Sequence, residues 1–205
     1  MVNIERPIGV WIAVATAVCS ALASGCGEVL YAATKTGAFK GRLVVEWIQP
    51  DQFIYSPDPN TPLRFEIAGR APIQPQRMLT DGGSIPRLFW SHPGFGPWDF
   101  GPGYIIHDWL FHQHHCKIGN WNEISFEDSA VVLAEAIKTQ MEKAPPSQRD
   151  PQVVWAIYEA VKSPIAHDLW DTGMCETTPP LAPAGPTAAS PPSVPIKVYS
   201  FGSGP

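Results

Sequence analysis

The spacing of apolar residues in this chain changes near residue 100, and this change limits the folds open to it. Before that point, β-branched and aromatic residues gather in three short runs, at 43–48, 53–55 and 63–67, separated by Pro, Asp and Asn. Such runs are typical of β-strands joined by turns. After that point, apolar residues recur at the three- and four-residue spacing of amphipathic helices. The order predicts an α+β fold in which a small antiparallel β-sheet is followed by a three-helix half.

The helical half contains three expected helices. The first covers residues 103–115, the second begins at Ser125, and the third spans residues 150–164, where Pro151 suits a first helical turn. Residues 70–90 predict one further short strand that leads into a glycine-rich turn. The inward face of the second helix is expected to consist of Val131, Val132, Ala134, Ala136 and Ile137.

The N-terminal segment reads as a targeting signal. A short head, MVNIERP, precedes the apolar run IGVWIAVATAVCSALA and the sequence ASGC, which resembles a bacterial lipobox in which the cysteine is acylated. The apolar run is too short and too weakly flanked for a membrane span. We therefore expect a lipoprotein signal peptide over residues 1–25, a lipid on Cys26 and a linker over residues 26–38. Ordinary secretion and a retained anchor are the alternatives.

The remaining chain divides into one domain and a tail. Residues 176–205 are rich in Pro and Ala and are expected to be disordered, because they hold too little apolar surface to fold. Residues 39–175 then form a single α+β domain. The net charge of −5 gives no reason to expect a nucleic-acid partner. The expected partner is the membrane of the bacterial cell envelope, reached through the lipid on Cys26, with the domain facing the periplasm.

Cysteine usage follows from this localisation. Of the four cysteines, Cys19 leaves with the signal peptide and Cys26 takes the lipid, which leaves Cys116 and Cys175. An oxidising periplasm favours a disulfide between these two, which would join the end of the first helix to the C-terminal region. Two unpaired thiols are the alternative.

A His-Asp pair, His107-Asp108, lies inside the apolar stretch GPGYIIHDWLFHQHH. A buried imidazole beside a buried carboxylate is costly unless both have partners, so the pair either braces the core or does chemistry. A second copy, His167-Asp168, lies near the C-terminal end and is expected to be solvated. One face of the first helix is expected to carry Tyr104, His107, Asp108, Phe111 and His115.

The second helix offers a carboxylate for this pair. If it packs antiparallel to the first, Asp128 in its first turn can hold one nitrogen of His107 and leave the other as a general base. Asp108 could then bind a hard cation that stabilises an oxyanion while water attacks an ester. Asp128 also fits a capping box with Ser125, and the two roles are compatible.

The segment TDGGSIPR contributes Asp81 and Arg87. In an architectural interpretation, Asp81 stabilises a turn and Arg87 pairs with a carboxylate. In a functional interpretation, Asp81 enters the same cleft as a further metal or proton ligand. The run HQHH at residues 112–115 resembles a metal cluster, although a solvated helix end is the more usual role of such a run.

Two families resemble this arrangement. TDGGSIPR, HDWLF and EDSA, in that order, resemble an uncharacterised phage and bacterial family defined by a TDxxSIPR segment and an HDWLY helix, over roughly residues 39–165. This resemblance implies kinship of fold and no particular activity. The His-Asp helix and the aspartate on the next helix are similar to those of phospholipase A2.

The second resemblance implies roles for individual residues. His107 would be the base, Asp108 the calcium ligand and Asp128 the partner of His107, and GFGPWDFGPG would be the calcium loop. Phe111 stands where that family has a tyrosine and lacks its hydroxyl.

Three functions therefore fit the sequence. The first is a lipid-anchored envelope hydrolase of esters or phospholipids, with Ca²⁺ as the expected cofactor. The second is a metal-dependent cell-wall hydrolase, with Zn²⁺ as the alternative ion and Asp81, His107, Asp108 and Asp128 as ligands. The third is a non-enzymatic envelope or phage-derived structural lipoprotein, whose His-Asp pair braces the core.

Overall fold

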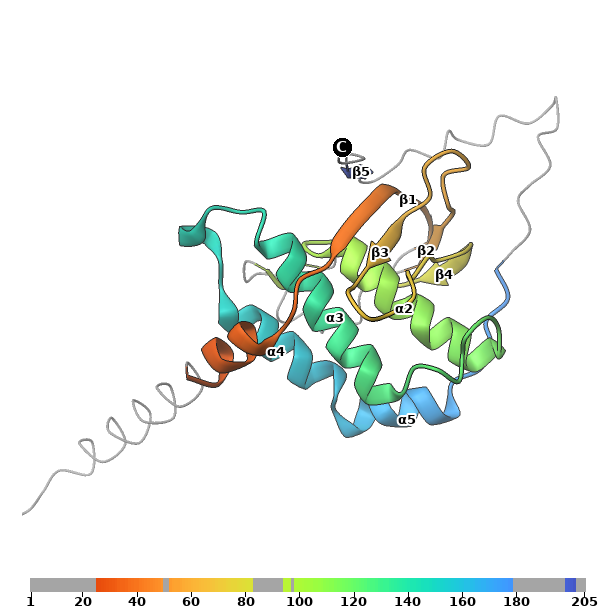
Figure 1. Ribbon diagram of the computed structural model, residues 1–205. Helices are drawn as coiled ribbons and strands as arrows, with labels where there is room; N and C mark the ends of the chain where they lie inside the picture. Colours follow the sequence, from red (N-terminus) through yellow and green to blue (C-terminus); the bar gives the residue numbers. More distant parts are fainter. Residues whose placement is uncertain (1–24, 50–51, 83–93, 97, 179–197, 202–205) are drawn as a thin grey trace, which may run out of the picture.

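The computed structural model describes residues 25–49, 52–82, 94–96, 98–178 and 198–201. A small curled antiparallel sheet lies against one side of helix α2 (Gly101–Cys116), and further helices cover the other side (Figure 1). This is the α+β architecture that the change in apolar spacing predicts. Among the described helices, none is both long and apolar enough to cross a bilayer.

The sheet is built around one long strand, β1 (Ala38–Gln49). Its neighbours are β2 (Gln52–Tyr55) and β3 (Arg64–Glu66), and β4 (Met78–Thr80) pairs with β2, which gives the order β3-β1-β2-β4. All these pairs are antiparallel, with Phe39 opposite Phe65 and Val45 opposite Tyr55. Alternate residues of β1 face α2, and Phe39, Leu43 and Val45 are buried there. β4 forms the edge of the sheet that reaches the His-Asp region of α2.

A fifth strand lies within residues 176–205, which the sequence predicts to be disordered. β5 (Val198–Phe201) pairs antiparallel with Gly41–Val44, between the stretches of β1 that pair with β3 and β2. Its sequence, VYSF, contains the β-branched and aromatic residues that strands favour. A prediction from the average composition of the whole tail misses this strand, because the four residues are outnumbered by Pro and Ala.

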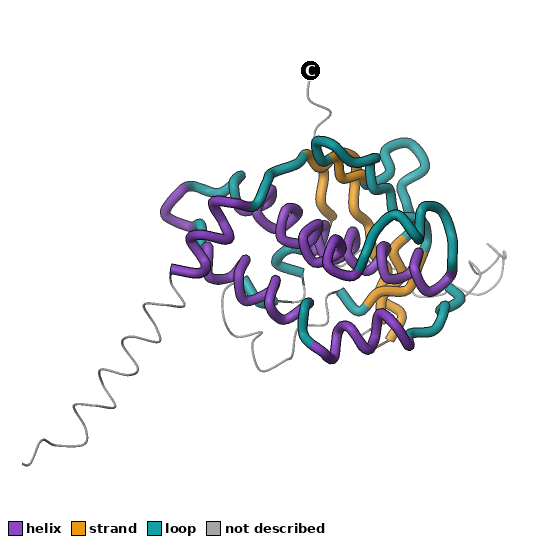
Figure 2. The backbone as a smooth tube through the Cα atoms, turned by 60° about the horizontal axis from the view of Figure 1, so that its bottom comes forward, coloured by secondary structure: helices purple, strands orange, loops and turns teal. Residues whose placement is uncertain are grey.

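The helical half contains the three expected helices and one more. α3 (Phe126–Met141) packs on α2, and α4 (Pro151–Val161) packs on α3 after a short 3₁₀ turn, η2 (Pro146–Gln148). α5 (Pro164–Thr172) follows at once and crosses the end of α2. Figure 2 shows α2 and α3 side by side, with the other helices around them. The inward face of α3 is close to the expected one, since Val132, Ala134, Ala136 and Ile137 are buried and Val131 is partly buried.

Residues 26–38, expected to be a linker, are mostly regular structure. Residues 25–33 are helical, and β1 begins at Ala38. The run EVLYAA consists mainly of residues that tolerate helix well, and Tyr31 packs against the buried cluster formed by α2, α3 and α4. Tertiary contact therefore orders a segment that looks like a polar spacer in the sequence.

The core consists of two apolar clusters that share α2 and α3. One lies between the sheet and α2, and the other lies between α2, α3 and α4. α2 is therefore covered on opposite sides, and most of its first ten residues are buried. Polar side chains in this part of α2 must find partners inside the protein.

Candidate functional site

His107 faces α3 and is 9% exposed. Its Nδ1 lies 3.3 Å from the main-chain oxygen of Ser129, and because a carbonyl only accepts, Nδ1 carries the proton of this hydrogen bond. Burial lowers the pKa of His107 to about 4, against the smaller opposing effects of the Ser129 carbonyl and the Asp81 charge. The imidazole is therefore neutral at pH 7.

Asp108 faces the sheet and is partly buried. The Thr80 hydroxyl at the end of β4 donates to Asp108 Oδ2 at 2.5 Å, and the Gly82 N–H donates to Thr80 Oγ1 at 3.0 Å. Burial, and then the charge of Asp81, raise the pKa of Asp108 to about 8, although the Thr80 hydrogen bond opposes the shift. The carboxyl group is therefore mostly protonated at pH 7.

The two residues thus bind different elements of the fold. His107 joins α2 to α3, and Asp108 joins α2 to β4. In a Ser-His-Asp type site, by contrast, an ionised carboxylate orients the imidazole and stabilises its charged form. Here both members of the pair are held in their neutral forms.

Asp128 is not the partner of His107, so the predicted dyad is wrong in its geometry. Its carboxylate accepts from Arg70 at 2.6 Å and forms a capping box with Ser125. Partial burial raises the pKa of Asp128, but the hydrogen bonds from Arg70 and Ser125 outweigh it and leave the pKa below its usual value. Capping turns this side chain back toward the start of α3, and the next residue, Ser129, meets His107 through its carbonyl.

The other residues expected at the site are dispersed. Asp81 directly follows β4, is exposed, and acts electrostatically on His107 and Asp108. Tyr104 is buried in the cluster with Phe100, whose ring lies 6.5 Å away. Phe111 lies 4.8 Å from the ring of Trp170 on α5 and 5.0 Å from that of His107. Arg87 lies outside the described residues.

The glycine-rich loop before α2 closes on its own carboxylate. Asp99 Oδ2 accepts from the N–H groups of Gly94 and Gly96, at 3.0 and 2.9 Å. A calcium loop instead presents carbonyl oxygens to the ion. These two contacts therefore give no support to calcium binding at residues 94–99.

The described residues do not fit the Ca²⁺ or Zn²⁺ expected from the sequence. They contain no group of three or more His, Cys, Asp or Glu side chains placed to hold a metal. Asp108, the expected first ligand, accepts a hydrogen bond from Thr80, and its raised pKa opposes the ionised form that a cation needs. The metal cofactor stays a prediction from sequence.

The histidines at the end of α2 hold α5 instead of a metal. His114 stacks on Trp170 at 4.1 Å between ring centroids, and His115 Nε2 lies 3.0 Å from the carbonyl oxygen of Leu169. The disulfide favoured by the sequence, Cys116–Cys175, is present and fastens the chain after α5 to the end of α2. This part of α2 serves as an attachment for the C-terminal helix.

Sequence reasoning missed three partners in this region: Thr80, Ser129 and Arg70. Thr80 had a signal, because it opens the TDGGSIPR segment and is a hydroxyl at the end of a short strand. The Ser129 contact is made by a main-chain atom and has no side-chain signal. Arg70 reaches Asp128 across 58 positions of sequence, which depends on the fold.

Comparison with known proteins identifies no relative of this chain. No protein-family model matches the chain, and neither a curated protein nor a solved structure matches it. The resemblances to the TDxxSIPR family and to phospholipase A2 stay predictions from sequence.

Proposed function

We propose that this chain is a non-enzymatic, lipid-anchored envelope protein in which His107 and Asp108 brace the domain. One observation carries the proposal: adjacent side chains of α2 bind two different elements, Ser129 of α3 and Thr80 of β4. Such a pair fixes the position of α2 between the sheet and the other helices. It contributes rigidity and does not present a reactive group to a substrate.

The protonation states support a structural role. A neutral imidazole and a protonated carboxyl are far cheaper to bury than an ion pair. Each group satisfies a hydrogen bond inside the protein, so the pair avoids the penalty of about 1–3 kcal/mol for an unsatisfied buried polar group. The pair therefore meets the requirements of a core contact, with Ser129 and Thr80 as its partners.

The envelope anchor rests on the sequence around Cys26. The ASGC stretch resembles a lipobox, and Cys26 is exposed and unpaired at the beginning of the helical segment 25–33. Attachment of a lipid there is compatible with the fold, because the side chain points away from the core.

Palmitate labelling of the full-length chain expressed in a Gram-negative bacterium tests the anchor. We expect label in the membrane-bound wild-type protein and in Cys19→Ser, and none in Cys26→Ser. Cys19→Ser is the matched control because it removes a thiol from the segment that the signal peptidase cleaves off. Label that persists in Cys26→Ser, or is missing from the wild type, would overturn the lipoprotein assignment.

A hydrolase is the second candidate, because one observation favours it. The protonated Asp108 is close enough to the exposed Asp81 for that charge to raise its pKa. A carboxyl group with a raised pKa beside a second carboxyl group is the usual arrangement of the acid in glycoside hydrolysis.

Turnover assays distinguish the two candidates. Phospholipid vesicles and peptidoglycan are offered with Ca²⁺ or Zn²⁺ to the wild type, to Asp81→Asn and to the control Glu127→Gln, which changes an exposed carboxylate on α3. The structural proposal expects no turnover above the protein-free rate. Turnover that is lost in Asp81→Asn and kept in Glu127→Gln would establish the hydrolase.

A further inference from the structure

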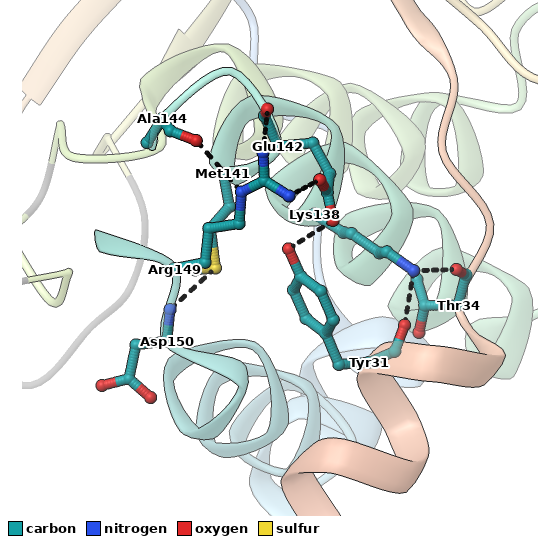
Figure 3. Close-up of polar contacts among 8 residues, drawn as sticks. All are labelled: Tyr31, Thr34, Lys138, Met141, Glu142, Ala144, Arg149 and Asp150. Atoms are coloured by element: carbon teal, nitrogen blue, oxygen red, sulfur yellow. Dashed lines mark hydrogen bonds and ion pairs between the residues drawn. The ribbon is translucent and has the colours of Figure 1, made fainter. Parts of the chain in front are cut away.

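The segment that joins Cys26 to the domain is held by a network of contacts at the C-terminal end of α3. The Lys138 ammonium donates to the carbonyl oxygens of Tyr31 and Thr34, at 2.5 and 2.8 Å (Figure 3). The Tyr31 hydroxyl donates to Glu142 Oε1 at 2.8 Å, and Arg149 binds the other oxygen of Glu142. We call these five residues the anchor clamp.

Contacts on either side of the anchor clamp extend the attachment. The Gly37 N–H donates to Thr139 Oγ1 at 2.8 Å, just before β1 begins. On the other side, Gly27 lies so close to α4 that an added Cβ would come within 2.2 Å of Gln152 Nε2. The Lys138 ammonium also lies 4.6 Å from the centre of the Tyr31 ring. Residues 27–37 thus contact α3 or α4 at four positions along their length: Gly27, Tyr31, Thr34 and Gly37.

This attachment changes how far the domain can move from its anchor. Cys26 precedes Tyr31 by five helical residues, a rise of about 8 Å. A flexible linker over residues 26–38 would instead allow a root-mean-square separation of about 20 Å and free rotation.

The charges support a stable clamp, since the Glu142 carboxylate accepts hydrogen bonds from both a phenol hydroxyl and a guanidinium. Partial burial and this hydrogen bond raise the pKa of Tyr31 to about 12, so the hydroxyl stays a donor.

We infer that the anchor clamp holds the domain in one orientation on the lipid bilayer, with the C-terminal end of α3 and the start of α4 toward the membrane. The inference rests on the proposed lipidation of Cys26. The partner surface is the bilayer itself, and the loop that contains η2 is the part of the domain nearest to it.

The opposite end of the molecule then faces away from the membrane. Gly103 lies against Ala136 and Gln140, so α2 and α3 run antiparallel, and the end of α2 lies at the start of α3. α3 has 16 residues and is about 24 Å long. The disulfide and α5 therefore project into the periplasm, together with three exposed apolar side chains of that end: Ile165, Leu169 and Met174.

Two spin labels on the full-length protein test the clamp. Ala32→Cys labels the helical segment, and Glu159→Cys labels an exposed position of α4. We expect a distance distribution a few ångströms wide between the labels, and a several-fold broader one when Tyr31→Phe and Lys138→Met are combined. The matched control is Lys162→Met. The Lys162 ammonium lies 4.5 Å from the centre of the Tyr158 ring, so this substitution also removes a lysine–tyrosine contact, but one outside the clamp.

Each outcome decides for or against the clamp. A broad distribution in the otherwise wild-type protein, or an unchanged one in the double variant, would overturn it. If the double variant unfolds, Tyr31→Phe alone is measured, and it should broaden the distribution by a smaller amount.

The same distance is measured in a Cys26→Ser chain, which carries no lipid. A narrow distribution there, with no palmitate label on the wild type, would retain the clamp and reject the anchor.

The orientation is tested on lipid vesicles of phosphatidylethanolamine and phosphatidylglycerol. A label at Ser147→Cys, in η2, is expected to collide with oxygen dissolved in the bilayer, whereas one at Asp168→Cys, on α5, is expected to collide with a water-soluble nickel complex. The reverse pattern, or equal exposure of both labels to the nickel complex, would overturn the orientation.

Discussion

The dipeptide His-Asp occurs twice in this protein, in opposite environments. His107-Asp108 lies in the middle of α2, covered by the sheet and α3, and each residue binds a different element. His167-Asp168 lies on α5 with both side chains exposed, and His167 contacts its helical neighbour Asp171, at 3.3 Å, and the ring of Phe126, at 4.6 Å between centroids. The sequence of the pair is the same, so the difference in partners comes from the surroundings that the fold provides. A dipeptide motif therefore carries little functional information without its surroundings.

The largest expected change in stability concerns the disulfide Cys116–Cys175, which joins the end of α2 to the chain after α5. Replacing both Cys116 and Cys175 by Ser removes a 59-residue cross-link and is expected to lower the free energy of unfolding by about 4 kcal/mol. Hydrogen exchange should accelerate in α5 while α2 stays protected, because the buried pair holds α2 independently. Urea unfolding and exchange measured by mass spectrometry check this. Equal loss of protection in both helices would show that the two regions form one cooperative unit.

Alanine substitutions compare the two pairs directly. His107→Ala or Asp108→Ala leaves a cavity and an unsatisfied partner, and each is expected to cost about 3 kcal/mol of unfolding free energy. His167→Ala and Asp168→Ala are expected to stay within about 0.5 kcal/mol of the wild type. Thermal and urea unfolding provide the values. If the buried and exposed substitutions cost the same, the brace is not supported.

The shifted pKa values of His107 and Asp108 predict a pH dependence of the stability. The folded-state pKa of Asp108 is raised to about 8, so its contribution to stability is full below the unfolded-state pKa of 3.8 and is lost as the pH rises toward 8. The lowered pKa of His107 has the opposite effect, but only below its unfolded value of 6.5. Between pH 6.5 and 8 only the Asp108 effect remains.

Over that range, the unfolding free energy of the wild type is expected to fall by up to about 2 kcal/mol. Asp108→Asn should flatten the fall, whereas Asp168→Asn should leave it unchanged. Urea unfolding at half-unit pH steps provides the curves. A wild-type curve that is flat or rising from pH 6.5 to 8 contradicts the protonated state of Asp108.

The smallest expected change in stability distinguishes the two roles considered for Asp128, the N-terminal cap of α3 and the partner of His107. Asp128→Ala is expected to cost about 1 kcal/mol of unfolding free energy, because it removes the capping box of α3 and the contact with Arg70. The pKa of His107, measured by NMR titration, should stay unchanged in this variant. A fall in that pKa would indicate that Asp128 acts on His107 after all.

The sequence predicted the fold better than the site. Apolar spacing determines the strands and helices, because each element must bury one face, and the helix-end disulfide follows from cysteine usage and compartment. The ordered segment 25–33 and β5 escaped prediction because each is short, lies beside polar or Pro-rich sequence, and is held by tertiary contacts.

At the site, the sequence drew attention to His107-Asp108, whose partners in the structure are Ser129 and Thr80, and to the segment that contains Thr80 and Asp81. It gave Asp128 the wrong partner, since helix spacing alone does not say which way a side chain in a first turn points. Capping decided that direction in the structure. The contact of His107 with a main-chain carbonyl has no counterpart in the pattern of side chains.

A double-mutant cycle on Thr80 and Asp108 tests the brace most directly. The unfolding free energies of Thr80→Val, Asp108→Ala and the double variant give the coupling energy between the β4 hydroxyl and the α2 carboxyl. We expect a favourable coupling of at least about 1 kcal/mol, well above that of the exposed pair His167–Asp171 measured in the same way. A coupling near zero would show that Asp108 does not hold α2 to the sheet, and would contradict the structural role proposed for the pair.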